Sequence, residues 1–145
     1  MSRDTDLPFA LPQTLPAQLP KLYAYWNGLK RAQNAIPFWD DVKLSDLPDL
    51  APRLMLIDAF AKPARYRFAL VGSEIVARSG TGIEGLFVDD VERLDPFHFF
   101  IPQCAVTVEA AAGSFYRTPD YARLLLPMWG DGQISMLLGG FGWTS

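Results

Sequence analysis

The chain has very few of the side chains that form disulfides, hold metals or transfer protons. Its 145 residues include one cysteine, Cys104, and one histidine, His98. A single cysteine excludes an internal disulfide and is typical of a reducing compartment. A structural zinc site needs several cysteine or histidine ligands, and one of each does not supply them. We therefore expect neither a disulfide-stapled scaffold nor a bound metal.

The sequence also lacks an excess of positive charge and a long apolar run. Its 13 Lys and Arg are outnumbered by 16 Asp and Glu, giving a net charge of −3, and both signs are spread along the chain. Binding to nucleic acid or to an anionic membrane would favour clustered basic residues. No apolar run reaches the roughly 18 residues of a membrane span, and the first residues lack the apolar core of a signal peptide. We expect a cytoplasmic protein with no nucleic-acid partner and no membrane insertion.

The residues that are plentiful predict one folded domain preceded by an arm. Half of the sequence is hydrophobic, which is enough for the core of a single domain. Leu-Pro pairs recur four times within residues 1–20. Proline has no N–H to donate and biases the preceding residue towards an extended backbone. We predict a flexible arm over residues 1–20 and a domain over residues 21–145.

A strand followed by a short helix organises the predicted domain. Tyr66, Phe68 and Leu70 alternate with other residues, and this period of two predicts a strand with the three side chains on its core face. A short helix is predicted over residues 74–78. Gly80 then suits the left-handed conformation that often ends a helix. This order places small side chains and turns beside one face of a sheet.

The other elements predict an α+β fold. We expect a strand over residues 54–60, joined by a hairpin loop to the strand just described, and a helix beginning at Asp95 that is kinked or broken at Pro102. Three further strands are expected at 114–118, 121–128 and 133–141. The sheet then has five antiparallel strands covered on one face by helices. Its buried face is predicted to carry Phe68, Leu70, Leu56, Leu126 and Met136.

An amphipathic helix is predicted near the N-terminus, over residues 22–30. Its apolar positions recur at helical spacing and are Leu22, Tyr25, Trp26 and Leu29. Two uses of this face are open at the sequence level: it caps the uncovered side of the sheet, or it pairs with its copy in a homodimer.

Three patterns resemble catalytic or cofactor motifs. Residues 80–85 match G-x-G-x-x-G, but a helix precedes them and none is predicted to follow, so a glycine-rich loop is the better interpretation. His98 could be an axial haem ligand or a general base, and Cys104 could form a flavin adduct. Packing roles suit both residues better, because no second histidine and no polar shell for a flavin accompany them. We expect no required cofactor and no catalysis.

Several short motifs together resemble a PAS-like family of alphaproteobacteria that was formerly a domain of unknown function. They span residues 21–141, and the resemblance is carried by Tyr25-Trp26, Lys30-Arg31, Pro37, LMLID at 54–58, YRFALVG at 66–72, Ile75, Gly80, Gly85, LLPM at 125–128 and Gly132. Trp39-Asp40-Asp41 departs from the family, which often has an arginine before its acid. The resemblance implies a PAS sheet of order 2-1-5-4-3. It also implies a sensory or regulatory role in bacterial signal transduction, with output through a separate signalling protein.

The resemblance also implies where a ligand would lie. A PAS pocket carried onto this chain has apolar walls, so it suits a small neutral or fatty ligand. Its walls would be Phe68, Ile75, Phe100, Ile101, Cys104, Leu126 and Met136, with His98 at the margin. A filled core that works only by docking a partner is the competing outcome. A third possibility is a small NTF2-like enzyme that pairs His98 with Asp58, an acid which we place at a strand edge or turn.

Overall fold

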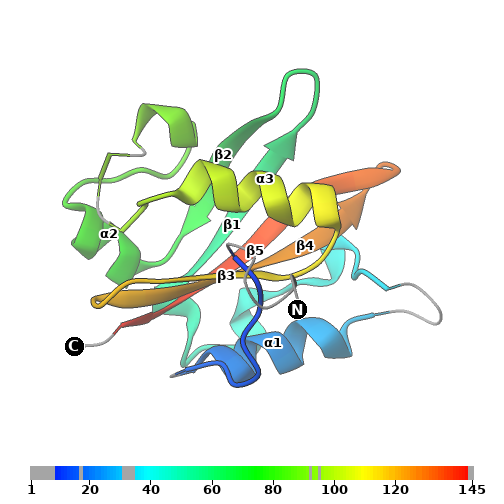
Figure 1. Cartoon of the computed structure of the whole chain (residues 1–145), viewed down its shortest axis with the longest axis horizontal. Coiled ribbons are helices and arrows are strands. Elements are labelled where there is room, and N and C mark those ends of the chain that lie inside the picture. Colours follow the sequence, from blue (N-terminus) through cyan, green and yellow to red (C-terminus); the bar gives the residue numbers. More distant parts are fainter. Residues whose placement is uncertain (1–8, 17, 31–34, 92, 95, 144–145) are drawn as a thin grey trace, which may run out of the picture.

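The fold is a single antiparallel sheet of five strands in the order β2-β1-β5-β4-β3 (Figure 1). The computed structural model describes residues 9–16, 18–30, 35–91, 93–94 and 96–143. The strands are β1 Leu54–Phe60, β2 Arg65–Val71, β3 Ser114–Arg117, β4 Tyr121–Gly130 and β5 Gln133–Trp143. The helices are α1 Leu19–Gly28, α2 Ser73–Ser79 and α3 Phe100–Ala110. The predicted α+β class and strand order are therefore confirmed.

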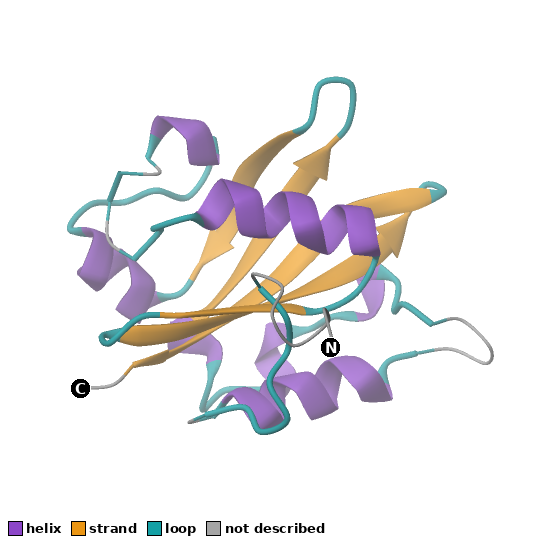
Figure 2. Ribbon diagram, viewed as in Figure 1, coloured by secondary structure: helices purple, strands orange, loops and turns teal. Residues whose placement is uncertain are grey.

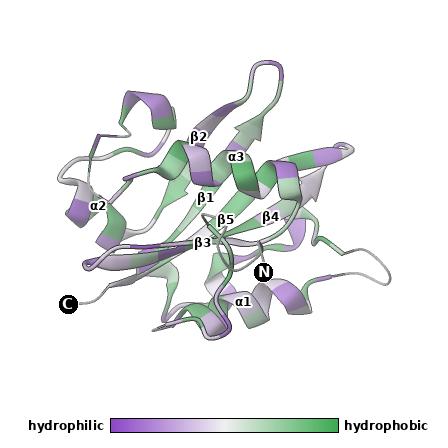
Figure 3. Ribbon diagram, in the orientation of Figure 1, coloured by the Kyte–Doolittle hydropathy of each residue, from purple (hydrophilic) through white to green (hydrophobic). Residues whose placement is uncertain are grey.

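Helices lie on both faces of the sheet, not on one as predicted. α2 and α3 lie on one side, and α1 lies on the other (Figures 1 and 2). Two clusters of buried side chains result, one between the sheet and α3 and one between the sheet and α1. The sheet and the inner sides of the helices carry much of the hydrophobic colour in Figure 3. Because β4 contributes to both clusters, every residue from Tyr121 to Met128 is buried.

α1 is held on the sheet by its tryptophan. The Trp26 indole N–H donates to the carbonyl oxygen of Pro127 at 2.8 Å, and the Trp26 side chain is 4% exposed. β4 extends past the end of β3 at this point, so the Pro127 carbonyl has no strand partner on that side. A proline is tolerated there because its missing N–H would also have faced outwards. The helix begins at Leu19, two residues before the predicted domain boundary, with Pro20 in its first turn where proline is favoured.

A bulge in β2 changes the predicted side of Leu70. Ile57 pairs with Phe68, but the preceding residue of β1, Leu56, pairs with Leu70. Ala69 of β2 is therefore an extra residue without a partner position in β1. Tyr66 and Phe68 are buried as predicted, whereas Leu70 turns to the α1 side and is 38% exposed. Strict alternation across the whole strand was therefore a wrong assumption.

α3 is shorter than predicted because of Pro102. The helix begins at Phe100, which places Pro102 in the first turn, where its missing N–H would have had no partner in any case. The predicted kink does not occur, and the turns before Phe100 replace the predicted first helical residues. The predicted cap, Asp95, lies outside the described residues. The helix ends at Ala110, with Ala111 rather than Gly113 in the left-handed conformation.

The edges of the sheet are covered by non-strand segments. At β3, the Phe115 N–H donates to the carbonyl of Phe9 in the arm, at 2.9 Å. At β2, the Phe68 N–H donates to the Leu86 carbonyl, also at 2.9 Å. The part of β4 that extends past β3 is covered in the same way, because the Trp129 N–H donates to the Pro37 carbonyl at 2.8 Å. Phe9 of the arm thus lies on the edge of the sheet. The flexible arm over residues 1–20 stays a prediction.

Candidate functional site

The predicted pocket lies in the core between the sheet and α3, and aromatic rings fill it. Phe68, Ile75, Phe100 and Cys104 meet there as predicted, each fully buried, and Ile101 packs partly buried against them. Phe97 inserts between them, with its ring centroid 5.0 Å from that of Phe68 and 5.3 Å from that of Phe100. The Phe68 and Phe100 rings stack at 6.0 Å. These distances are those of directly packed rings.

Two of the predicted wall residues lie on the wrong side of the sheet. Leu126 is buried in the α1 cluster and Met136 packs against that cluster. Leu126 pairs with Leu138 and Met136 pairs with Met128, and all four side chains belong to the α1 cluster. Successive side chains of a strand point to opposite faces. Leu125 and Leu137 face α3 instead. The predicted wall was therefore displaced by one residue in each of the two strands.

His98 lies beside the edge strand β3, whereas Asp58 is in β1 and pairs with Arg67, so the two residues do not form the predicted pair. The His98 imidazole is exposed. Its ring centroid lies 4.3 Å from that of Phe99 and 6.4 Å from that of Tyr116, in the edge strand β3. Asp58 forms an ion pair of 2.9 Å with Arg67 in β2, the other edge strand. Asp58 itself is in β1, between two neighbours, and is not the edge or turn residue that we predicted. The NTF2-like alternative thus loses the polar pair on which it depended.

The sequence interpretation missed a buried arginine, Arg123, which is fully enclosed beneath the aromatic residues of β3 and α3. Its guanidinium donates three hydrogen bonds: from Nε to Gln103 Oε1 at 2.6 Å, from Nη1 to the Pro96 carbonyl at 3.0 Å and from Nη2 to the His98 carbonyl at 2.8 Å. The guanidinium carbon lies 4.8 Å from the ring centroid of Tyr116. Arg123 thus fixes the turns that lead into α3.

A chain of polar side chains continues from Arg123 into the core. The Gln103 amide nitrogen donates to Ser114 Oγ at 3.0 Å, and the hydroxyls of Ser114 and Thr107 are 2.6 Å apart. Thr107 also donates to the Gln103 carbonyl at 2.8 Å. Burial lowers the pKa of Arg123 to about 10, so the guanidinium stays charged at neutral pH. The available signal was the sequence YARLLLPMW, in which one arginine interrupts an apolar strand.

The turn that Arg123 fixes presents an exposed phenylalanine. Phe99 lies between His98 and Phe100 with a φ of +55°, and 55% of its surface is exposed, the largest fraction among the exposed large hydrophobic side chains. A bulky residue in the left-handed region is strained. The rings of Phe99 and Tyr116 meet edge-on at 5.9 Å, and the Phe9 ring of the arm contacts Tyr116 at 6.0 Å. We call Phe9, His98, Phe99 and Tyr116 the aromatic ridge.

The predicted interface residues of α1 are used mostly within the chain. Leu22 and Trp26 are buried against the sheet, with 0% and 4% exposure. Tyr25 is partly buried, and its hydroxyl donates to the carboxylate of Asp46 at 3.1 Å. Leu29 is also partly buried, directly after the last helical residue. α1 therefore caps the uncovered side of the sheet, the first of the two uses left open by the sequence.

The remaining candidate motifs have structural roles. The glycine-rich loop packs on β2: Ile83 is buried, and the Glu84 carboxylate accepts the Val71 N–H at 2.9 Å. Gly80 has the predicted left-handed conformation, with a φ of +80°. Burial raises the pKa of the Cys104 thiol, which makes it a poor nucleophile. Within the described ranges, no three His, Cys, Asp or Glu residues are grouped as a metal site requires, and no helix is both long and apolar enough to cross a membrane.

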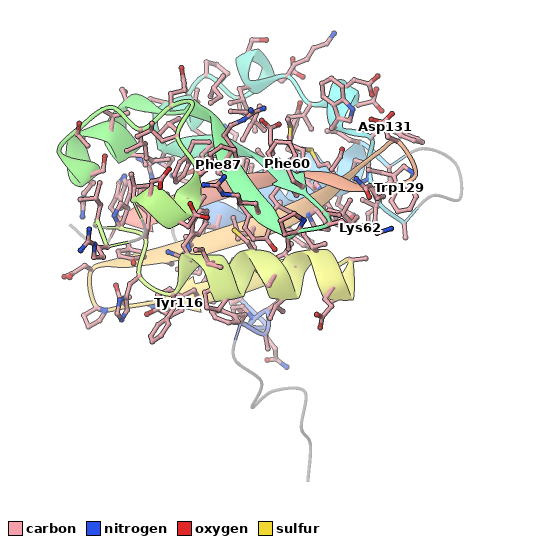
Figure 4. The ribbon with its side chains drawn as sticks, turned by 90° about the horizontal axis from the view of Figure 1, so that it is seen from above. Phe60, Lys62, Phe87, Tyr116, Trp129 and Asp131 are labelled. Atoms are coloured by element: carbon pink, nitrogen blue, oxygen red, sulfur yellow. The ribbon has the colours of Figure 1, made fainter. Side chains whose placement is uncertain are left out.

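A shallow cleft of about 360 Å³ lies at the turn between β1 and β2. We call it the hairpin cleft; it is lined by Phe60, Ala61, Pro63, Arg65, Arg67 and Phe87. Figure 4 shows Phe60 and Phe87 side by side, and their centroids are 6.1 Å apart. Tyr116 of the aromatic ridge lies well away from both. The aromatic ridge and the hairpin cleft are therefore separate aromatic surfaces, and Trp39, 46% exposed, lies in neither of them.

Comparisons with protein-family models, with curated proteins and with solved structures find no match to this chain.

Proposed function

We propose that this chain is a PAS-like regulatory module that works by docking a separate signalling protein, and that its core holds no ligand. The observation that carries this proposal is the filled core. Phe68, Phe97 and Phe100 contact one another where a PAS ligand would lie, and each is 0% exposed. A ligand pocket instead keeps a concave space of several hundred Å³ between its walls.

The strand order supports the PAS-like part of the proposal. The order β2-β1-β5-β4-β3 is the one that the resemblance implies, with α2 and α3 forming the connection from β2 to β3. Such a sheet serves many functions, so the order alone does not identify one. The site therefore has to carry the functional argument.

The aromatic ridge is the surface that we assign to docking. Phe99 is held in a strained conformation by neighbours that Arg123 fixes, and its ring points to solvent. Strained backbone conformations of this kind cluster at functional positions. Exposed aromatic residues near the centre of a contact commonly supply most of its binding energy. The ridge would thus contribute a preformed apolar anchor.

The test replaces Phe99 with asparagine. Asparagine tolerates the left-handed conformation better than phenylalanine, so Phe99→Asn should leave the protein at least as stable while removing the anchor. Proteins that co-purify with the wild type from its native host would be compared with those of Phe99→Asn, and the leading candidate would be purified and its affinity measured by calorimetry. The matched control is Val106→Gln, which removes a 39% exposed apolar side chain from α3.

The proposal predicts a partner that binds the wild type and Val106→Gln alike and is lost with Phe99→Asn. Native mass spectrometry of the purified wild type should give the mass of the polypeptide alone. A stoichiometric apolar compound retained in that spectrum would contradict the filled core, and equal binding by Phe99→Asn would contradict the role of the ridge.

A further inference from the structure

Each of the two arginines that line the hairpin cleft pairs with an aspartate, and the two pairs differ in how the carboxylate oxygens are used. Arg65 and Asp89 form a closed fork, in which Nε donates to Oδ2 at 2.9 Å and Nη2 donates to Oδ1 at 3.1 Å. This fork uses both carboxylate oxygens. Arg65 also stacks on Phe87, with its guanidinium carbon 3.7 Å from the ring centroid. The first pair is therefore satisfied within the chain.

The second pair, Arg67 and Asp58, is open. Arg67 Nε and Nη2 both donate to the same oxygen, Asp58 Oδ2, at 3.1 and 2.9 Å. Within the described part of the chain, Arg67 Nη1 donates no hydrogen bond and Asp58 Oδ1 accepts none. The Arg67 side chain is 43% exposed and that of Asp58 is 21% exposed. The partly exposed pair thus has unused donor capacity on Arg67 Nη1 and unused acceptor capacity on Asp58 Oδ1.

These groups lie on a part of the sheet that α1 does not cover. Asp58 and Arg67 are cross-strand partners, as are Phe60 and Arg65, and all four share the α1 face of the β1–β2 hairpin. α1 packs against β4 and β5 instead. Phe60 is 41% exposed, and Leu70, turned to this face by the bulge, is 38% exposed. The surface combines exposed apolar side chains with arginine and aromatic rings, the composition enriched at protein interfaces.

We infer that this hairpin surface binds a second copy of the chain across a twofold axis. A twofold interface requires a surface that is complementary to itself, so that residue i meets residue j and j meets i. The open pair meets this requirement, since Arg67 Nη1 of one copy can donate to Asp58 Oδ1 of the other and receive the same contact in return. Its charges sum to zero, so two copies of a protein with net charge −3 can approach here without opposing like charges.

The apolar side chains fit the same arrangement. The hairpin cleft has about 360 Å³ of space, and an apolar cavity of about 150 Å³ is enough to hold a benzene ring. The exposed Phe60 ring of one copy therefore has room in the hairpin cleft of the other, beside the packed Phe60 and Phe87 rings. This surface is separate from the aromatic ridge, so the inference does not depend on the proposed docking function.

Sedimentation velocity over a concentration series in the micromolar range tests the inference, with light scattering as a second measure of mass. The wild type should be a dimer that weakens in high salt, because the reciprocal ion pairs are screened. Phe60→Glu places a charge in the contact at an exposed position and should give a folded monomer. Val106→Glu makes the same change at a similarly exposed residue elsewhere and should remain dimeric.

A charge exchange makes the test specific for the reciprocal pair. The double variant Asp58→Arg/Arg67→Asp keeps a pair within the chain and a complementary pair between identical copies, so it should form homodimers. A mixture of wild type and exchange variant would bring arginine against arginine and aspartate against aspartate, so native mass spectrometry should show few mixed dimers. The inference is overturned by a wild type that stays monomeric throughout the series, by a dimeric Phe60→Glu, or by mixed dimers at the statistical proportion. None of these results bears on binding at Phe99.

Discussion

Replacing Arg123 with methionine tests whether the buried guanidinium holds the turns before α3. Methionine keeps a long unbranched side chain but donates no hydrogen bond. The change leaves three oxygens without their donor, those of Gln103, Pro96 and His98. A buried acceptor left without a donor costs about 1–3 kcal/mol, so the gross loss is about 3–9 kcal/mol. The His98 carbonyl is only part-buried and can bind water again, which favours the lower half of this range.

Removing the charge gives a gain that opposes this loss. Burial lowers the pKa of Arg123 from its ordinary value to about 10, and each pKa unit corresponds to about 1.4 kcal/mol, so holding the charge costs about 3 kcal/mol. The expected net effect of Arg123→Met is a loss of up to about 3 kcal/mol in the free energy of unfolding. Because the native pKa lies below the unfolded one, the cost of the charge is fully present below about pH 10 and is relieved as the pH rises through that value. The difference between wild type and variant should therefore be constant from acid to neutral pH.

Urea unfolding followed by circular dichroism measures this difference, provided that the slope of the transition is unchanged. Hydrogen exchange gives a second readout, since the amides of residues 97–103 should exchange faster in Arg123→Met. Arg117→Met, at an exposed position of β3, is the control and should change stability by less than about 0.5 kcal/mol. An Arg123→Met protein as stable as the wild type, with unchanged hydrogen exchange in these turns, would refute the role of Arg123 in holding them.

Three further predictions concern the core, the cap on β4 and the hairpin cleft. Phe68→Ala should lower the free energy of unfolding by about 3–5 kcal/mol because the ring is fully buried, and a loss below about 1 kcal/mol would mean that it is not packed in the core. Trp26→Phe keeps a ring but removes the donor to Pro127, so it should cost about 1–3 kcal/mol by urea titration, and no change would show that water replaces the indole. The hydrogen bonds from Arg65 lower the pKa of Asp89 below its usual 3.8, and NMR titration should find that value raised in Arg65→Met. This pair stabilises the protein fully above about pH 3.8 and loses its effect as the pH falls through the lowered pKa, so an unchanged Asp89 pKa in the variant would exclude the pairing in solution.

Local sequence signals predicted the first hairpin well. The strand Leu54–Phe60 has the predicted bounds, and Arg65–Val71 lies where the alternating pattern predicted a strand, because strong apolar patterns end at turn residues there. Gly80 was predicted to adopt the left-handed conformation for a similarly local reason. These features depend on neighbouring residues, so one sequence contains the necessary information.

Features set by distant contacts were predicted less well. Leu70 was placed on the wrong face because the bulge at Ala69 depends on pairing with β1. Leu126 and Met136 were assigned to the pocket because β4 is apolar on both sides, so alternation did not distinguish its two faces. Arg123 was overlooked because its acceptors are two turn carbonyls and the side-chain amide of Gln103 in α3, up to 27 positions away, which no charge pattern reveals.

The covered edges of the sheet limit the ways in which this protein can recognise a peptide. Many signalling domains add a ligand as an extra strand, which requires a free row of backbone N–H and C=O groups. Here the Phe68, Phe115 and Trp129 N–H groups already donate to Leu86, Phe9 and Pro37. A partner strand would first have to displace one of these segments, so recognition at these places has to rely on side chains. The same covering protects the sheet from edge-to-edge association with other chains. Removing the arm up to Phe9 would expose the edge strand β3 to such association.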